Sequence, residues 1–351
     1  MSSFASDNVT GIAPAILAAL QAANAGSAPA YGEDAVTARL SERVSHLFER
    51  DCAVFPVATG SAANSLAMAA LVPRYGAVYC HREAHLNVDE CGGPEFYTGG
   101  AKLVALDGAH AKIDAAALEA AIDGAGDVHR VQPAALSITQ ASEKGTVYTA
   151  AEVAALAAVA RRHNLAFHMD GARFANAVAR LGCSPAAITW QAGVDVLSLG
   201  ATKNGALAAE AVVFFDPPRA GDFAYLRKRG GHLLSKMRFL SVQLEAYLSD
   251  GLWLANARHA NAQAARLAEG LERLPGARLL STVEANEIFV ALPEAVIVGL
   301  EARGFGFFRW GRPEEGQIRL VTAFDTAPEA VDAFLAAAAD LCGGGDTRAR
   351  A

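Results

Sequence analysis

Six short runs of apolar residues recur along the first 200 positions, and alanine-rich segments separate them. The runs are AVFPV (53–57), AVYC (77–80), KLVAL (102–106), ALSIT (135–139), LAFHM (165–169) and VDVLSL (194–199). Strands that alternate with helices indicate an α/β fold with a mostly parallel sheet. The runs are apolar throughout instead of alternating, which is typical of strands with helices on both faces.

Polar residues mark where several helices should begin. Thr149 and Glu152 form the pattern of a capping box, in which each side chain bonds the other residue's main chain. Ser184 precedes a proline, and Thr326 precedes a Pro-Glu pair at 328–329. A capping residue followed by proline in the first helical turn is a helix-start signal, so we expect helices after both positions.

The pattern changes near residue 250. A long helical stretch over 252–274 precedes three strand-like runs, ARLL, IFVAL and QIRLV, and then an alanine-rich helix from about Pro328. We therefore expect a large domain over 1–250, with an N-terminal arm over 1–30, and a smaller C-terminal α/β domain over 251–342. The glycine-rich and charged segment 343–351 is expected to fray.

Composition narrows the possible partners. The 351 residues are 52% hydrophobic, and 30 Lys and Arg stand against 37 Asp and Glu, a net charge of −7. This balance disfavours nucleic acid, and no apolar segment approaches the ~20 residues that span a bilayer. The five cysteines are scattered without a CxxC pair, which fits reduced thiols and gives no reason to expect a metal. We expect a cytoplasmic protein without membrane or nucleic-acid partners.

An aspartate and a lysine stand at the carboxyl ends of two of the predicted strands. Asp170 follows LAFHM, and Lys203 follows VDVLSL in the segment GATKNG. Ligands of open α/β sheets bind at this edge. Lys203 alone is most simply a surface lysine. Together with Asp170 it suggests pyridoxal phosphate, which needs a Schiff-base lysine and an acid for its pyridinium nitrogen.

A phosphate site is expected at another helix start. Gly60 and Ser61 follow AVFPV and precede an apolar helix, whose N-terminal N–H groups would hold a dianion. An ordinary Gly-Ser turn that caps a helix is the plain alternative.

Three further side chains could face the same edge of the sheet. His85 lies a few residues after AVYC, where a histidine can stack on a cofactor ring or move a proton. Arg173, three residues beyond Asp170, and Arg319, in QIRLV, are candidate partners for an amino-acid carboxylate. Structural histidine and surface arginine are the ordinary alternatives.

The chain resembles a known family over nearly its whole length, from Phe4 to about Thr326. The segments FASDNVTG, YGEDAVTAR, TGSAANSLA, AHLNVDECGGPEF, HMDGARFANA, SLGATKNG and RLVTAFDT stand in the order of the low-specificity L-threonine aldolases. These are pyridoxal-phosphate enzymes of the aspartate-aminotransferase-like fold, also called fold type I. HMDGAR followed by the lysine segment is the specific part of this resemblance.

The resemblance implies how the cofactor would be held. Lys203 looks like the lysine that binds the cofactor covalently, and Asp170 like the partner of its pyridine nitrogen. Gly60 and Ser61 match the phosphate cradle. His85 matches the histidine that stacks on the ring.

The resemblance also implies substrate and subunit contacts. Arg173 stands where the family's arginine meets the cofactor ring oxygen, close to the substrate, and Arg319 where the substrate carboxylate binds. Ser6 matches a serine near that carboxylate. Tyr31 resembles a tyrosine that the neighbouring subunit donates, which implies a homodimer or homotetramer with shared sites. Lys236 lies where many relatives have an arginine that reaches a neighbour's phosphate.

One segment departs from the family. Many members carry Thr-His-Asn before Gly-Thr-Val-Tyr, whereas this chain has TQASEKGTVY. Gln140 thus replaces a histidine that contacts the substrate hydroxyl, and an amide cannot titrate.

The resemblance implies a lyase that splits L-threonine, L-allo-threonine and related β-hydroxy-α-amino acids into glycine and an aldehyde. His85, directly or through water, is the expected base at the β-hydroxyl. A β-eliminating lyase or an aminotransferase of the same fold would share Lys203 and Asp170 and is the alternative. A non-catalytic protein would require Lys203 to be idle.

Overall fold

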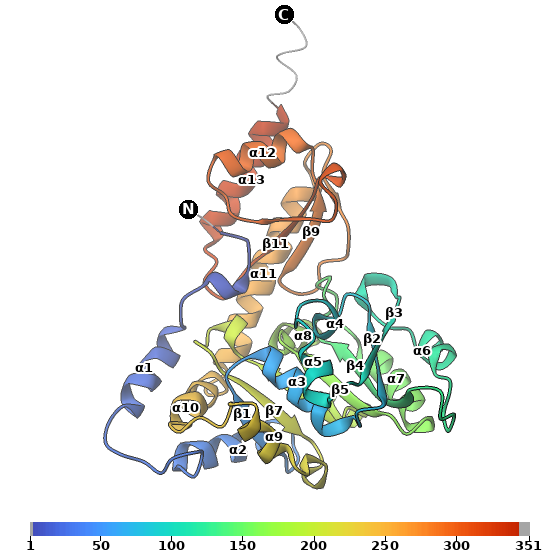
Figure 1. Cartoon of the computed structure of the whole chain (residues 1–351). Coiled ribbons are helices and arrows are strands. Elements are labelled where there is room, and N and C mark those ends of the chain that lie inside the picture. Colours follow the sequence, from blue (N-terminus) through green and yellow to red (C-terminus); the bar gives the residue numbers. More distant parts are fainter. Residues whose placement is uncertain (1–2, 344–351) are drawn as a thin grey trace, which may run out of the picture.

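The computed structural model describes residues 3–343 and contains two β-sheets (Figure 1). The larger sheet has seven strands in the order β1-β7-β6-β5-β4-β2-β3. Its strands are β1 Ala53–Val57, β2 Gly76–His81, β3 Lys102–Leu106, β4 Gln132–Thr139, β5 Ala166–Gly171, β6 Val196–Gly200 and β7 Glu210–Phe214. Neighbours from β3 to β6 are parallel, while β7 is antiparallel to both β6 and β1.

The six predicted strands are therefore confirmed, and β7 is the strand that the sequence pattern missed. The residues before it, ALAA (206–209), are rich in alanine and resemble a helical segment. The strand forms because its apolar side chains, Val212 and Val213, are fully buried on opposite faces of the sheet. Burial thus outweighs the local helical preference.

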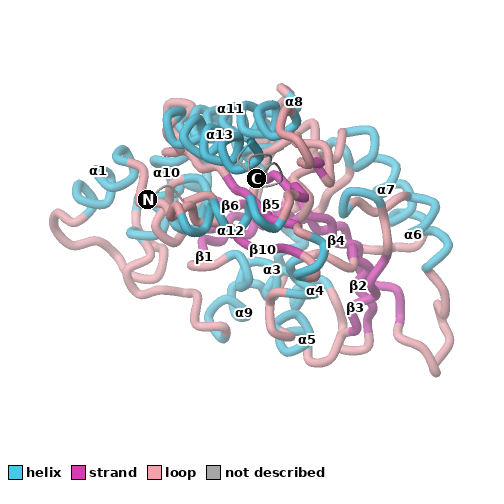
Figure 2. Tube along the Cα trace, turned by 90° about the horizontal axis from the view of Figure 1, so that it is seen from above, coloured by secondary structure: helices cyan, strands magenta, loops and turns pink. Residues whose placement is uncertain are grey.

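Helices cover both faces of the large sheet (Figure 2). In β6, Val196 packs in one hydrophobic cluster and Leu197 in another, because successive side chains of a strand point to opposite faces. The cluster of Val196 includes residues of α3 (Gly60–Leu71) and α9 (Phe223–Arg229). The cluster of Leu197 includes residues of α2 (Ala35–Leu47), α7 (Ala150–Arg162) and α8 (Phe174–Leu181). This double cover explains why the strands are apolar throughout.

The second sheet is antiparallel, with the order β10-β11-β9-β8. Its strands are β8 Arg278–Leu279, β9 Glu287–Ala291, β10 Phe308–Trp310 and β11 Gln317–Val321. It packs with α11 (Leu252–Glu272), α12 (Glu294–Ala302) and α13 (Pro328–Gly343), and Phe4 joins their core. Three of these strands match predicted runs. The position of the domain boundary near residue 250 stays a prediction.

The predicted helix starts have three different outcomes. Thr149 and Glu152 form the capping box that the sequence predicts. The segment after Ser184 forms turns instead of a helix, although the Ser184 hydroxyl accepts the Ala187 N–H at 3.3 Å. The last helix begins at Pro328 as predicted, but Thr326 is not its cap, because its hydroxyl accepts the N–H of Ala323 at 2.7 Å.

The remaining helices include α1 Pro14–Ala23, α4 His85–Val88, α5 Gly93–Thr98, α6 Ala115–Ala121 and α10 Arg238–Tyr247. Within residues 3–343 no helix combines the length and the apolar character needed to cross a bilayer. Most of the tail that we expect to fray, residues 344–351, lies outside the described residues.

Candidate active site

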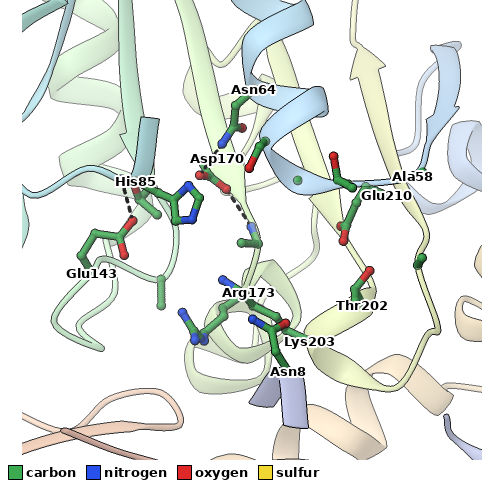
Figure 3. Close-up of a pocket in the computed structure, with 17 residues that line it drawn as sticks. Asn8, Ala58, Asn64, His85, Glu143, Asp170, Arg173, Thr202, Lys203 and Glu210 are labelled. Carbon is green, nitrogen blue, oxygen red and sulfur yellow. Dashed lines mark hydrogen bonds between the residues drawn. The ribbon is translucent and has the colours of Figure 1, made fainter. Parts of the chain in front are cut away.

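A cavity of about 290 Å³ opens at the carboxyl ends of β4, β5 and β6. Asp170, Lys203, His85 and Arg173 line it together (Figure 3). The sequence places these four residues at the ends of different strands or in the loops that follow them. Because the strands are parallel, their carboxyl ends lie at one edge of the sheet. The structure therefore brings these side chains together, as the sequence predicts.

Asp170 is held by two hydrogen-bond donors at the end of β5. One carboxylate oxygen accepts the Asn64 side-chain N–H at 2.8 Å, and the other accepts the Ala172 main-chain N–H at 3.0 Å. Asn64 lies in α3, so the helix that begins at Gly60 also orients the aspartate. Asp170 is 4% exposed and lines the cavity.

Lys203 lies in a short 3-10 helix, Thr202–Asn204, just after β6. Gly200 allows this segment to run beside the end of β5, because a Cβ there would stand 2.7 Å from the carbonyl oxygen of Ala172. Lys203 and His85 lie on different sides of the cavity, and Asp170 stands beside His85 in this view (Figure 3). A larger residue at position 200 would push the lysine loop away from Asp170.

The N-terminus of α3 faces the same cavity. Thr59 caps the helix by accepting the N–H of Ala62 at 3.2 Å. Within the described part of the chain, the N–H groups of Gly60 and Ser61 have no hydrogen-bond partner. A Cβ at Gly60 would meet no atom within 4 Å, so the space beside this helix end is open. Free N–H groups and the helix dipole suit a phosphate dianion.

His85 belongs to a hydrogen-bonded network that reaches Asp170. Its Nδ1 lies 2.9 Å from Glu90, and the Asn64 amide nitrogen donates one hydrogen to Glu90 and one to Asp170, both at 2.8 Å. The hydrogen bond to Glu90 raises the pKa of His85, although burial opposes it. Burial raises the pKa of Glu90. Both pKa shifts favour a proton shared between the two side chains.

Arg173 is buried and carries two carboxylates. Its Nε and Nη2 bind Asp7 at 2.8 and 3.0 Å, and its Nη1 lies 3.0 Å from Glu287. Burial opposes ionisation of Asp7, but the Arg173 guanidinium outweighs burial and lowers the pKa of Asp7. Asn286 also donates to Asp7, at 3.0 Å.

Arg319 is not among the residues that line the cavity. It lies on β11, and its Nε and Nη2 bind Glu287 at 3.0 and 2.6 Å. Glu287 therefore bridges Arg319 and Arg173. The Arg319 guanidinium, which the sequence predicts to bind a substrate carboxylate, thus binds the protein's own Glu287 carboxylate.

Gln140 does not face the cavity either, so the structure does not bring it to the predicted substrate contact. The side chain is fully buried, its amide nitrogen donates to the Tyr148 carbonyl at 2.8 Å, and its oxygen accepts the Tyr148 N–H at 3.0 Å. Both polar ends are thus occupied by main chain. Thr139 and Ala141, on either side of Gln140, line the cavity instead.

The remaining predicted residues lie at or beyond the rim. Ser6 caps the turn Asp7–Val9 through the N–H of Asn8, and Asn8 lines the cavity. Tyr31 is 48% exposed, with the Lys228 ammonium 4.8 Å from its ring centre. Lys236 is exposed as well. None of these three side chains lines the cavity of the single chain.

Sequence reasoning missed three carboxyl groups of the site, of which Glu90 and Glu210 are buried and Glu143 is half-buried. Glu90 bonds His85, while Glu143 and Glu210 line the cavity. Burial raises the pKa of Glu143 to about 6 and that of Glu210 to about 7. The signal available for Glu143 was its place in TQASEKG, the segment that departs from the family pattern.

The mostly parallel sheet with Lys203 and Asp170 at its edge, and a smaller antiparallel sheet beside it, is the arrangement of the fold-type-I enzymes that use pyridoxal phosphate. A family model described as beta-eliminating lyase matches residues 3–295, and the chain belongs to that family.

Similar proteins narrow the comparison further. A protein of Pseudomonas aeruginosa named low specificity L-threonine aldolase is 46% identical over 328 residues, covering 93% of this chain and 94% of the relative. A protein of the same name from Pseudomonas sp. (strain NCIMB 10558) is 43% identical, with 92% and 93% covered. The solved threonine aldolase of Leishmania major superposes with a TM-score of 0.92 at 28% identity, covering 97% of this chain and all of that one. The predicted fold class and family resemblance are confirmed.

Proposed function

We propose that this protein is a pyridoxal-phosphate-dependent lyase for β-hydroxy-α-amino acids. It would cleave L-threonine, L-allo-threonine and related substrates such as L-phenylserine to glycine and an aldehyde. The observation that carries the proposal is the cavity in which Lys203, Asp170 and the open N-terminus of α3 come together. The names of the relatives point to the same reaction.

The residues of the cavity fit the cofactor by their chemistry. The N–H groups of Gly60 and Ser61 would hold its phosphate, and Asp170 would bind its pyridine nitrogen. Lys203 would bind it covalently, and His85 would lie against the ring. When bound, pyridoxal phosphate withdraws the electron pair that is released at the substrate's Cα.

The chain's own residues would then perform three tasks. The Asp170 carboxylate holds a proton on the pyridine nitrogen, and its two donors keep the carboxylate in place. The Lys203 amine is available to move a proton at Cα. Arg173, in the cavity wall, and Arg319 would provide guanidinium groups for the substrate carboxylate, and Ser6 would provide a hydroxyl. Arg319 must exchange its bond to Glu287 for that contact.

A shared site between subunits is part of the proposal. Tyr31 and Lys236 are exposed and lie outside the cavity of their own chain, as expected for groups that serve a neighbour's site. The assembly would be a homodimer or a homotetramer. Light scattering of the purified protein gives its mass, and activity recovered by mixing inactive Lys203→Ala and Tyr31→Ala proteins would indicate shared sites.

We also place the protein in the cytoplasm. All five cysteines are free thiols, which is usual in reducing compartments.

The test of the function is a product analysis. Purified protein with pyridoxal phosphate is mixed with L-threonine, L-allo-threonine and L-phenylserine, and glycine, aldehyde and keto acids are quantified. Equal amounts of glycine and aldehyde without a keto acid support aldol cleavage. A keto acid would instead indicate a β-eliminating lyase or an aminotransferase. Lys203→Ala protein is the control for non-enzymatic cleavage.

A further inference from the structure

The proposed cleavage needs a group that takes the proton of the substrate β-hydroxyl, and the cavity offers one besides the expected His85. The Gln140 amide does not titrate, and Tyr148 occupies both of its ends. The His85 ring bonds Glu90 through Nδ1, and this bond raises the pKa of the ring. The ring can take the hydroxyl proton only in its neutral form, so a raised pKa moves that activity to higher pH.

Glu143 occupies the wall of the cavity on the side of His85 (Figure 3). Its Oε1 accepts the main-chain N–H of His85 at 3.1 Å, which fixes the carboxylate at that wall. Within residues 3–343 no hydrogen bond is made to its Oε2. The neighbouring Lys144 does not neutralise it, because that ammonium bonds Glu83 at 3.2 Å. Glu143 therefore has one anchored oxygen and one oxygen free to accept a proton.

We infer that Glu143 is the catalytic residue that accepts the β-hydroxyl proton, an inference that rests on the proposed aldol cleavage. The O–H bond of the substrate breaks, and its proton passes to Oε2 of Glu143. The electron pair of that bond becomes the second C–O bond of the aldehyde while the Cα–Cβ bond breaks. The pair from Cα–Cβ would go to the electron-withdrawing cofactor that Lys203 and Asp170 would hold, and a proton that adds to Cα would yield glycine. Glu143 returns its proton to water after the aldehyde leaves.

The electrostatics of the cavity agree with this role. Burial raises the pKa of Glu143 to about 6, and nearby negative groups act in the same direction while positive groups oppose them. The charged groups that face it are His85, Asp170, Glu287, Lys203 and Arg173. A general base is most effective when its pKa lies near the working pH. The carboxylate is present above about pH 6 and is lost below it.

The test compares Glu143→Gln with the wild type and with Glu83→Gln. The glutamine keeps the shape of Glu143 and an oxygen for the His85 N–H, and Glu83 provides the same substitution in an ion pair outside the cavity. We expect kcat/KM for L-threonine to fall about 100-fold or more in Glu143→Gln, the contribution typical of a general base. The acid limb of the wild-type pH profile near pH 6 should disappear. Glu83→Gln should leave both unchanged.

A second measurement separates this role from a structural one. Exchange of the glycine α-hydrogen with D2O, followed by NMR, uses the cofactor, Lys203 and Asp170 but no hydroxyl. We expect Glu143→Gln to retain this exchange while it loses cleavage. Loss of both to the same extent, or kcat/KM within about threefold of the wild type, well short of a general base's contribution, would overturn the inference.

The outcomes also separate this inference from the proposed function. If wild-type protein releases no glycine from L-threonine, the proposed function fails. If it does, only Glu143 is in question. Should Glu143→Gln not fold, Glu143→Asp decides, because the shorter carboxylate should lower kcat/KM and move the acid limb. If Glu143→Asp changes neither kcat/KM nor the acid limb of the pH profile, the inference is contradicted.

Discussion

The amide of Asn64 connects two buried carboxylates, and its removal tests the electrostatic design of the site. One nitrogen donates its two hydrogens to Glu90 and to Asp170, each at 2.8 Å. Asn64→Ala deletes both bonds without adding bulk. Asn87→Ala is the matched control, because the Asn87 amide makes one bond, to the carbonyl of Arg82, near the surface.

The expected loss follows from the number and kind of bonds. A hydrogen bond to a charged group contributes about 1.5–3 kcal/mol, so two uncompensated losses would cost about 3–6 kcal/mol. Asp170 retains the Ala172 N–H, and Glu90 retains His85 and Ser65. We therefore expect the free energy of unfolding to fall by about 3 kcal/mol at pH 8, and by about 1 kcal/mol or less in Asn87→Ala.

The loss should depend on pH. Asn64 lowers the pKa of Glu90 against the effect of burial, so its removal raises the folded-state pKa further. A carboxyl whose pKa is higher in the folded state stabilises the protein at low pH, and that stability disappears as pH rises through the folded pKa. Urea unfolding of the cofactor-free variant should thus show a larger deficit at pH 8 than at pH 5.5. A deficit below about 0.5 kcal/mol at pH 8, within the range of ordinary surface substitutions, would refute the reasoning.

Three further substitutions test the roles proposed in the cavity. Lys203→Ala should fold normally but lose turnover and the borohydride-reducible link between protein and cofactor, and a variant that keeps both would disprove the lysine assignment. Asp170→Asn should bind the cofactor but lose most of kcat, because a neutral amide does not favour a protonated pyridine nitrogen, and a near-normal kcat would count against this role. Arg319→Ala should raise KM for amino acids by about one to two decades, the value of a charge-assisted pair, while cofactor affinity measured by fluorescence changes far less.

A strand or helix could be predicted from the sequence when the hydrophobic pattern of its own residues identifies it. The continuous apolar runs identified six strands of the large sheet, because burial on both faces leaves no polar alternation. β7 and β10 were missed for a physical reason. β7 follows an alanine-rich segment, and the exposed three-residue β10 gains its partner, β11, only in the folded sheet.

The part of the site that could be predicted is the set of residues at the carboxyl ends of the parallel strands. The edge rule for parallel sheets brings Asp170, Lys203 and His85 together whatever the details of packing. The pairing of Arg173 with Asp7 joins residues 166 positions apart, and Glu287 comes from the second sheet. No local pattern encodes such contacts. Because of these contacts, Arg319 bonds Glu287, and Arg173 forms ion pairs with Asp7 and Glu287 in the cavity wall.

The segment 140–146 illustrates why the identity of a base is harder to predict than its neighbourhood. Gln140 and Glu143 are three residues apart, and the sequence alone does not say which of them faces the cavity. The turn is fixed by Ser142, whose N–H bonds the Thr146 carbonyl and whose hydroxyl bonds the His110 carbonyl, both at 2.8 Å. With Gln140 held by Tyr148, this turn leaves Glu143 as the titratable side chain of the segment at the cavity. On this loop Gln140 is therefore bonded to main chain, and the Glu143 carboxylate is the group placed to accept a proton in the cavity.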